Sequence, residues 1–262
     1  MNGKVIFVSA GPGAADLITL RGARALGQAD IVLADALADP ALRDFAPQAR
    51  WIAVGKRGFE HSAKQTEINA LLVKAAQEHA LVVRLKGGDA SIFGRLEEEL
   101  IALAEAGIAS EVVPGVTAAL AAAAQAQRPL TRRGRGRSVS LTTAMTETGD
   151  LRAARSADTE VFYMAGRQLS GLGRQLLAAG WAPGTSTLVV SRAGCADAIT
   201  SEHRLADLAR AALLHRGRPT VVTVGTGALP IAGKDQGPSP TKIADSPETL
   251  PSQAPLTSPS CP

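Results

Sequence analysis

Short apolar runs that end in glycine-rich turns constrain the fold of this chain more than any other feature of its sequence. The first, residues 4–10, reads KVIFVSA and is followed directly by Gly11-Pro12-Gly13. A run of this length bounded by a turn is typical of a strand buried on both faces. Segments with helical spacing alternate with such runs, which predicts an α/β fold with largely parallel or mixed sheets, each flanked by helices.

The predicted strands cover residues 4–10, 31–34, 51–54, 81–85, 111–113, 138–142, 160–163, 187–191 and 220–224. The predicted helices cover residues 65–79, 94–106, 118–125, 168–179 and 205–214. The clearest helix is 65–79, where Ile68, Leu71, Leu72 and Ala75 keep the spacing of one buried face. In residues 94–106 three glutamates, at positions 97–99, lie near the start, where the helix dipole favours negative charge.

The elements divide into two series that meet near Pro114. We therefore expect two α/β domains, residues 1–114 and 115–229. Residues 230–262 have a different composition, because the stretch from Ile231 onward holds seven of the fifteen prolines together with many serines and threonines. Such a segment buries too little apolar surface to offset the entropy lost on ordering, which predicts a disordered tail.

Basic residues are concentrated in one place on a chain whose formal net charge is +4. Five arginines fall within ten residues: Arg128, Arg132, Arg133, Arg135 and Arg137. The cluster indicates either a solvated basic loop or an anionic partner, such as a duplex nucleic acid or a polycarboxylate metabolite. Aromatic residues make up only 3% of the chain, so platforms for stacking single-stranded nucleic acid are hard to build.

Several classes of protein are disfavoured by what the sequence lacks. Two cysteines, Cys195 and Cys261, are too few for a disulfide framework and fit a reducing cytoplasm. The four histidines show no paired spacing with cysteine or carboxylate, so we expect no metal site. The longest apolar run, residues 118–124, is too short to cross a bilayer, and we expect no signal peptide, because the chain enters an apolar strand at Val5 without a long apolar segment before it. We expect a cytoplasmic protein without a membrane contact.

Three motifs follow predicted strands. Glycines in Gly11-Pro12-Gly13 let a ligand approach the backbone at a strand's carboxyl end, although a purely structural turn is the alternative. The dinucleotide-binding fingerprint is not met, because Asp16 stands where its third glycine is expected. In Arg84–Arg95, Gly87 and Gly88 expose backbone groups, and Asp89 is able to accept hydrogen bonds from ribose hydroxyls or an amino group, or to cap the next helix.

The third motif, VVPGVTAA at residues 112–119, makes a Pro-Gly turn before an alanine-rich helix. Thr117 is the predicted N-cap of that helix, and the small side chains around it leave room for a flat ligand.

Taken together, these motifs resemble the tetrapyrrole methylase family, and within it the C-methyltransferases of uroporphyrinogen III. The resemblance covers about residues 3–227. The matching strings are Gly11-Pro12-Gly13, Leu33–Leu37, Gly55-Lys56-Arg57 with His61-Ser62 and Glu67–Asn69, Arg84–Arg95, Pro114–Ala119, Pro129–Gly134 and Tyr163-Met164.

The resemblance implies two α/β domains with S-adenosylmethionine bound between them, usually in a homodimer. It implies methylation of uroporphyrinogen III at C2 and C7 to give precorrin-2, on the route to sirohaem and cobalamin. Asp35 would be the proton acceptor and Lys56 the proton donor. The residues placed against the cofactor are Pro12, Gly87, Gly88, Asp89, Ile92, Thr117, Ala118, Met164 and Ala193.

Methyl transfer of this kind is compatible with the residue types at the matching positions. Methyl transfer from a sulfonium to an electron-rich ring carbon depends mainly on holding the two in line, and a proton must then leave the substrate. The substrate carries several carboxylates, for which Arg132, Arg133, Arg135 and Arg137 would be charge-assisted partners. This reading needs no nucleic-acid partner.

The chain departs from the family pattern at positions that could touch substrate. These are Ala34, Ala36, Ala90, Ser91, Arg132 and residues 143–145. Three other functions therefore stay open: a methylase of a later corrin precursor such as precorrin-4, an RNA methyltransferase of the same fold, and a relative that binds cofactor or tetrapyrrole without turnover.

Overall fold

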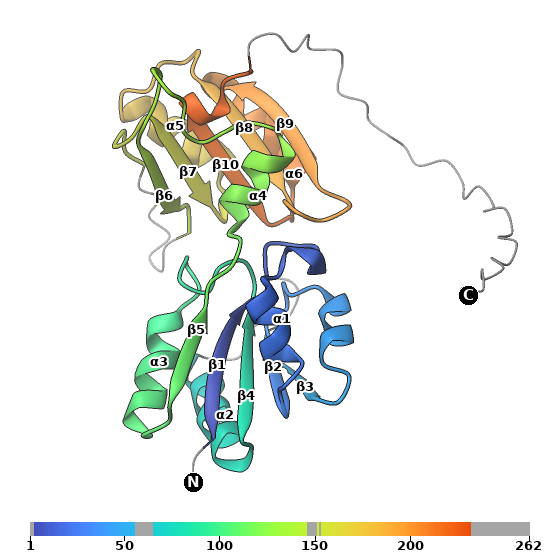
Figure 1. The fold of residues 1–262 in the computed structure, drawn as a ribbon. Helices are drawn as coiled ribbons and strands as arrows, with labels where there is room; N and C mark the ends of the chain where they lie inside the picture. Colours follow the sequence, from blue (N-terminus) through green and yellow to red (C-terminus); the bar gives the residue numbers. More distant parts are fainter. Residues whose placement is uncertain (1–2, 56–64, 146–150, 152, 232–262) are drawn as a thin grey trace, which may run out of the picture. The chain divides into compact units, whose positions relative to one another are not determined.

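The computed structural model describes residues 3–55, 65–145, 151 and 153–231, and within these ranges the chain builds two five-stranded sheets (Figure 1). By their contacts both sheets belong to one unit, residues 1–230. The domain boundary predicted near Pro114 therefore stays a prediction. Apart from Pro230 and Ile231, the predicted tail lies outside the described residues, and so does Cys261.

The first sheet is parallel throughout and has the strand order β3-β2-β4-β1-β5. Its strands are β1 (Lys4–Ser9), β2 (Ile31–Ala34), β3 (Arg50–Ala53), β4 (Leu81–Lys86) and β5 (Ser110–Val113). The helices between them are α1 (Leu20–Leu26), α2 (Gln65–Glu78) and α3 (Leu96–Glu105), with short 3-10 turns at Ala15–Leu17 and Pro40–Phe45.

Side chains of the interior strand β1 alternate between two apolar layers. Val5 and Phe7 of β1 pack with α2 and α3 on one face, whereas Ile6 and Val8 pack with α1 on the other. Figure 1 shows α1 in front of this sheet and α2 behind it. Burial on both faces explains why the central strands read as continuous apolar runs rather than as alternating ones.

The second sheet is mixed and has the order β6-β7-β10-β8-β9. Its strands are β6 (Val139–Thr143), β7 (Thr159–Tyr163), β8 (Ser186–Ser191), β9 (Ile199–Arg204) and β10 (Thr220–Gly225). The helices are α4 (Ala118–Gln125), α5 (Leu169–Ala178) and α6 (Ala211–His215), with 3-10 turns at Ala165–Arg167, Leu205–Arg210 and Thr226–Ala228. Only β6 and β7 pair in parallel, and the other three pairings are antiparallel.

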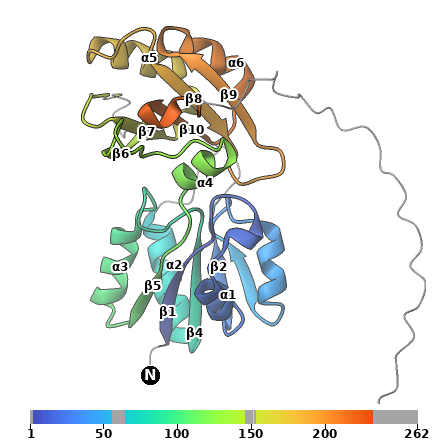
Figure 2. The ribbon, with the colours of Figure 1, turned by 45° about the horizontal axis from the view of Figure 1, so that its top comes forward.

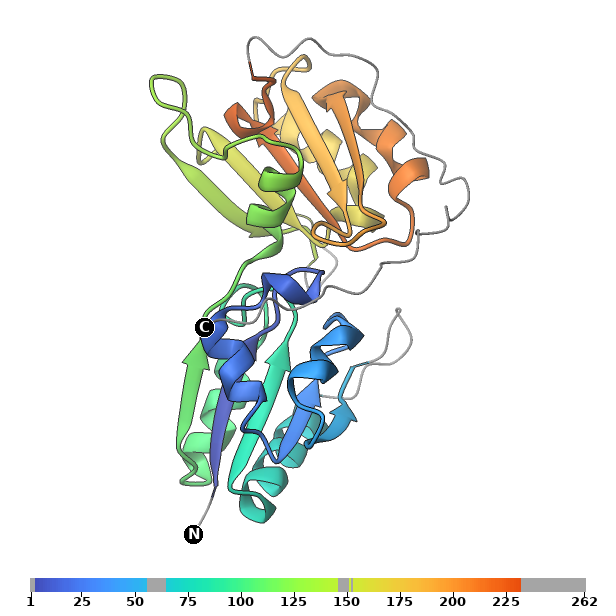
Figure 3. The same ribbon diagram turned by 45° about the vertical axis from the view of Figure 1, so that its right-hand side comes forward.

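The two faces of the second sheet carry different helices. Alanines of α4 pack against Val161, Leu188 and Val190, whereas leucines of α5 pack on the opposite face with Phe162 and Val189. Figure 2 shows α5 and α6 on one side of this sheet and α4 on the other. Residues 114–117 lead directly from β5 into α4, as Figure 3 shows.

The structure differs from the sequence-based expectations at two elements that were not predicted and in one predicted helix. The sequence analysis does not predict α1 or β9, and β9 is a half-exposed edge strand whose polar residues mask its pattern. The expected parallel or mixed sheets are confirmed, because the first sheet is parallel and the second is mixed. The predicted helix 205–214 begins as a 3-10 turn and becomes α-helical only at Ala211.

A buried histidine joins α6 to strands β8 and β9. His215 is 0% exposed; its Nδ1 lies 2.9 Å from Ser191 Oγ and its Nε2 lies 2.8 Å from Ser201 Oγ. Ser201 Oγ in turn lies 2.8 Å from His203 Nε2. Burial, followed by the charges of His203 and Arg218, lowers the pKa of His215 from 6.5 to about 4.

Acid should therefore destabilise the fold through His215. In the unfolded chain His215 binds a proton near pH 6.5, whereas in the folded chain its ring stays neutral down to about pH 4. The contribution of His215 to stability is therefore fully present above pH 6.5 and is lost as the pH falls toward 4. This one group should remove about 2 kcal/mol from the free energy of unfolding between pH 8 and pH 5. Urea unfolding at both pH values measures it.

His215→Gln should have a smaller loss of stability over the same interval, whereas His79→Gln, at the end of α2, should behave like the parent chain. An equal pH dependence in His215→Gln and the parent would contradict the assignment.

Candidate active site

The residues proposed for the cofactor follow the carboxyl ends of strands. All strands of the first sheet run in one direction, so the segments after β1, β2, β4 and β5 meet at a single edge. In the second sheet β7 and β8 are both antiparallel to β10, so their carboxyl ends also share an edge. Open α/β sheets bind ligands at such edges.

Two glycine turns of the first sheet are joined by backbone hydrogen bonds. The N–H of Gly88 donates to the carbonyl of Gly11 at 2.7 Å, and the N–H of Gly11 donates to the carbonyl of Gly88 at 3.2 Å. Both glycines have positive φ, +80° and +68°, a region that residues with a Cβ rarely adopt. The turns after β1 and β4 are thus fixed to each other.

Asp89 joins the turn after β4 to the segment after β5. Its Oδ2 accepts a hydrogen bond from the N–H of Gly115 at 2.7 Å, and its Oδ1 accepts from the N–H of Ser91 at 2.9 Å and from the Ser91 hydroxyl. Partial burial raises the pKa of the Asp89 carboxyl, but these hydrogen bonds outweigh it and hold the pKa below its ordinary value. Asp89 therefore stays ionised and caps its own turn rather than α3, whose N-cap residue is Arg95, and its contact with a ligand stays a prediction.

Tyr163, at the end of β7, ties the two sheets together. Its hydroxyl lies 2.8 Å from the hydroxyl of Thr117 and accepts a longer hydrogen bond from the N–H of Ala119 at 3.4 Å. The ring of Phe93 meets that of Tyr163 edge-on, with centroids 5.1 Å apart. Thr117 is the N-cap residue of α4, but its hydroxyl makes no capping hydrogen bond and contacts Tyr163 instead.

The loop after β8 contacts the loop after β1. The N–H of Ala14 donates to the carbonyl of Gly194 at 2.9 Å, and a Cβ on Gly13 would lie 2.6 Å from the carbonyl carbon of Gly194. Ala193, one residue earlier, is buried in the core of the second sheet. Gly13 is therefore required for this close approach.

Strained backbone is concentrated in the same loops. Five non-glycine residues among those described have positive φ: Phe93, Arg95, Gln127, Met164 and Arg192. All but Gln127 lie in the segments that follow β4, β7 and β8. Such conformations cost about 1–3 kcal/mol each and persist where the surroundings impose them, often at ligand sites.

A cofactor with an apolar and a polar part fits these residues. A Cβ on Gly88 would meet no atom within 4 Å, so there is open space above that backbone. Met164 and Phe93 are partly exposed although they are large and apolar. Ile92 and Ala118 pack at the edge of the core of the second sheet, and Pro12 is half-buried beside Gly194.

Asp35 lies at the end of β2, one strand from the glycine turns. Its N–H donates to the carbonyl of Leu85, and its Oδ1 accepts a hydrogen bond from Arg84 Nη2 at 2.6 Å. A Cβ on Gly55 would lie 3.1 Å from the N atom of Ala36, so the chain that leads to Lys56 starts next to Asp35. Lys56, Arg57 and His61-Ser62 lie outside the described residues.

The arginine cluster lies elsewhere. Arg137 and Ser138 donate backbone hydrogen bonds to Asp158, before the start of β7 and at the edge opposite Met164. Arg132 donates to the carbonyls of Leu229 and Pro230. In the same cluster Arg128 is buried and pairs with Glu202, whereas Arg133, Arg135 and Arg137 are exposed. Substrate binding by Arg132, Arg133, Arg135 and Arg137 stays a prediction.

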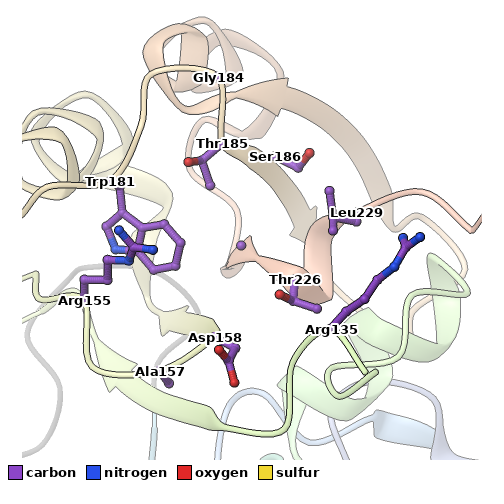
Figure 4. Close-up of a pocket in the computed structure, with 11 residues that line it drawn as sticks. Arg135, Arg155, Ala157, Asp158, Trp181, Gly184, Thr185, Ser186, Thr226 and Leu229 are labelled. Atoms are coloured by element: carbon purple, nitrogen blue, oxygen red, sulfur yellow. The ribbon is translucent and has the colours of Figure 1, made fainter. Parts of the chain in front are cut away.

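A pocket of about 410 Å³ lies at that opposite edge (Figure 4). Arg135 and Arg155 lie on opposite sides of it, and the guanidinium of Arg155 is 5.1 Å from the centroid of the Trp181 ring. Arg135, Arg155 and Asp158, its charged lining residues, are all exposed. Asp158 is already engaged by Ser138 and the backbone, so the pocket lacks a buried polar group to fix a ligand.

Five positions that depart from the family pattern, Ala90, Ser91 and residues 143–145, border these contacts. Ala90 is buried and its N–H donates to Ser9 Oγ at 3.0 Å, while Ser91 bonds Asp89. Thr143 pairs in register with Tyr163, which places residues 143–145 beside Met164. Sequence reasoning missed the Tyr163 hydroxyl, and it also missed Arg84, Lys86 and Glu99, charged residues in or against a buried strand.

Neither a metal cluster nor a membrane span is found in the described part of the chain. No three His, Cys, Asp or Glu side chains gather there as a metal ion would require. No helix within those ranges is long and apolar enough to cross a bilayer.

Known proteins are similar to this chain both in sequence and in fold. Residues 4–209 match the family model of Tetrapyrrole (Corrin/Porphyrin) Methylases. The chain is 41% identical over 230 residues to a uroporphyrinogen-III C-methyltransferase of Pseudomonas aeruginosa, covering 86% of this chain and 94% of that protein. It is 45% identical over 197 residues to a uroporphyrinogen-III C-methyltransferase of Bacillus subtilis, covering 72% of this chain but only 41% of that longer protein.

A solved structure agrees with these relatives. The uroporphyrin-III C-methyl transferase of Thermus thermophilus, complexed with S-adenyl homocysteine, is 35% identical and matches with a TM-score of 0.76, covering 86% of this chain and 98% of that one. The two mixed or parallel sheets with flanking helices are therefore the fold of these enzymes, as expected. With a family model over most of its length and a relative of nearly equal length, the chain belongs to the tetrapyrrole methylase family.

Proposed function

We propose that this chain is an S-adenosylmethionine-dependent C-methyltransferase that converts uroporphyrinogen III to precorrin-2, by methylation at C2 and C7. The observation that carries the proposal is the set of contacts joining the turns after β1, β4, β5, β7 and β8, because these turns hold the residues expected at the cofactor. The Pseudomonas relative, matched over 94% of its length, bears the name of this activity.

The cofactor would lie against the backbone of the two joined glycine turns and the exposed side chain of Met164. The contact residues in this proposal are Pro12, Gly87, Gly88, Asp89, Ile92, Thr117, Ala118, Met164 and Ala193. When bound, S-adenosylmethionine supplies an electrophilic methyl group on a sulfonium. The contribution of this chain is to hold the electron-rich ring carbon of the substrate in line with it and to exclude water.

Asp35 and Lys56 would handle protons in the reaction. Asp35 is ion-paired with Arg84 yet keeps a side chain that is 32% exposed, so its carboxylate is available to a substrate. We assign it the proton that leaves the methylated ring, and we assign proton donation to Lys56. The exposed arginines Arg133, Arg135 and Arg137, together with Arg132, would attract the carboxylates of the substrate from solution.

The proposal extends to the state of the protein in the cell. We propose a homodimer in the cytoplasm that acts on a free tetrapyrrole and uses no nucleic acid. The product would serve the sirohaem or the cobalamin route.

The first test is an anaerobic incubation of the pure chain with S-adenosylmethionine and uroporphyrinogen III, followed by mass spectrometry of the tetrapyrroles. The proposal expects a gain of two methyl groups. If the cofactor binds but no methyl group is transferred, the function fails and a methylase of a later corrin precursor takes its place.

Asp89→Asn should weaken binding of S-adenosylhomocysteine. The change removes a charged acceptor that fixes the turns after β4 and β5, which is worth about 1.5–3 kcal/mol, or about 10- to 100-fold in Kd. Isothermal titration calorimetry measures the Kd. Asp158→Asn is the matched control, because Asp158 accepts similar hydrogen bonds from a serine and the backbone at the opposite edge. An unchanged Kd in Asp89→Asn would remove Asp89 from the cofactor site.

Asp35→Asn should lower kcat by about 10²- to 10⁴-fold, the usual range for a lost general base, with the Kd of S-adenosylhomocysteine unchanged. Steady-state kinetics and calorimetry give the two values. Asp30→Asn, at the start of β2 and remote from the site, is the control and should leave kcat unaffected. Full turnover in Asp35→Asn would exclude Asp35 as the base.

A further inference from the structure

Four charged side chains meet beneath the end of β2. Arg84 Nη2 donates to Asp35 Oδ1 at 2.6 Å, and Arg84 Nε donates to Glu99 Oε1 at 3.0 Å. Lys86 Nζ donates to Glu99 Oε2 at 2.7 Å. Glu99 is 0% exposed and Arg84 and Lys86 are each 2% exposed, so only Asp35 reaches solvent.

The cluster is balanced in charge, and both oxygens of its buried carboxylate accept hydrogen bonds. Two cations face two carboxylates, which a buried position requires because an unpaired buried charge is strongly destabilising. Glu99 gives one oxygen to each cation, and Gln65 adds a hydrogen bond to Oε1 at 3.2 Å. Burial, followed by the charge of Arg84, lowers the pKa of Lys86, although Glu99 opposes this shift.

The guanidinium of Arg84 has little freedom. Its Nη1 donates to the carbonyl of Leu33 on the neighbouring strand β2 at 3.3 Å and to the carbonyl of Leu85 on its own strand at 3.1 Å. Its other nitrogens are held by Glu99 and Asp35. An arginine fixed on three sides is a rigid support, because its planar fork loses little further entropy on binding.

The outcome is a carboxylate with one oxygen fixed and the other available. Arg84 holds Asp35 Oδ1, whereas Asp35 Oδ2 has no hydrogen-bond partner among the described residues. We propose that Glu99 and Arg84 are positioning residues that hold Asp35 so that Oδ2 accepts the proton released by the methylated substrate. This inference rests on the proposed function, since it takes Asp35 as the base.

Glu99 has a second part in the proposal. When Oδ2 takes the proton, the electron pair of the broken bond stays on the ring and Asp35 becomes neutral. Arg84 would then be a buried cation without a counter-ion if Asp35 were its only partner. The Glu99 contact is unaffected by this step and keeps Arg84 in place, so Asp35 can gain and release a proton in each turnover without the support moving.

Arg84→Lys tests the inference, because a lysine keeps the charge but lacks the fork that joins Glu99 to Asp35. We expect kcat to fall by at least about tenfold, since small misplacements of a reacting group are costly in rate. KM for uroporphyrinogen III and the Kd of S-adenosylhomocysteine should stay within twofold. In an Asp35→Asn background, Arg84→Lys should cause no further loss of kcat. Losses that multiply would show that Arg84 acts independently and would overturn the proposal.

Crystal structures of the parent and Arg84→Lys provide a readout that does not depend on turnover. The proposal expects the Asp35 carboxylate to shift or to adopt several conformers in the variant, and an unmoved carboxylate would overturn it. If the parent chain transfers no methyl group to uroporphyrinogen III, the proposed function fails, and this comparison still decides whether Arg84 positions Asp35.

Two further variants guard against misfolding and non-specific effects. Glu99→Asp keeps the charge but withdraws the carboxylate by one methylene, and it should lower kcat in the same Asp35-dependent manner if Arg84→Lys does not fold. Lys4→Met breaks an exposed ion pair of similar length, 2.6 Å to Glu111, and should leave kcat unchanged. A loss in Lys4→Met equal to that in Arg84→Lys would contradict the proposal.

Discussion

Parallel pairing of β1 with β4 on one side and β5 on the other brings three turns to the same edge of the first sheet. Because each strand continues into its turn in the same direction, the register of the sheet fixes where every turn begins. The mutual hydrogen bonds of Gly11 and Gly88, and the bond from Gly115 to Asp89, then hold the turns together. The site is therefore a consequence of strand register rather than of any single loop.

The second sheet completes the site through few but specific contacts. Tyr163 meets Thr117 with its hydroxyl and Phe93 with its ring, and Gly194 accepts a hydrogen bond from Ala14. Met164, the residue after Tyr163, has left-handed backbone, a strain that the surrounding packing must support. Such strain at strand ends is consistent with turns shaped for a ligand rather than for stability.

Buried charge is the other constraint that the fold must satisfy. Arg84 and Lys86 lie in a central strand, where a cation is strongly unfavourable unless it is paired. From the sequence, Glu99 was expected to lie near the start of α3, where the helix dipole favours negative charge. In the structure it is fully buried and pairs with both cations. The cluster is weak evidence for stability, because a buried ion pair is often no more stable than an apolar substitute. Its contact with half-exposed Asp35 is the observation on which the proposed positioning role rests.

The sequence by itself determined the α/β class, most of the strands and helices, and the position of the glycine turns that we propose for the cofactor, because apolar periodicity and glycine depend on local geometry. Strand direction in the second sheet, the edge strand β9 and the pairing of Glu99 with Arg84 were decided only by tertiary structure. Residues 15 apart in the sequence meet in the Arg84–Glu99 pair, and 46 apart in Thr117–Tyr163. No local pattern encodes such contacts, because they depend on how helices pack on sheets.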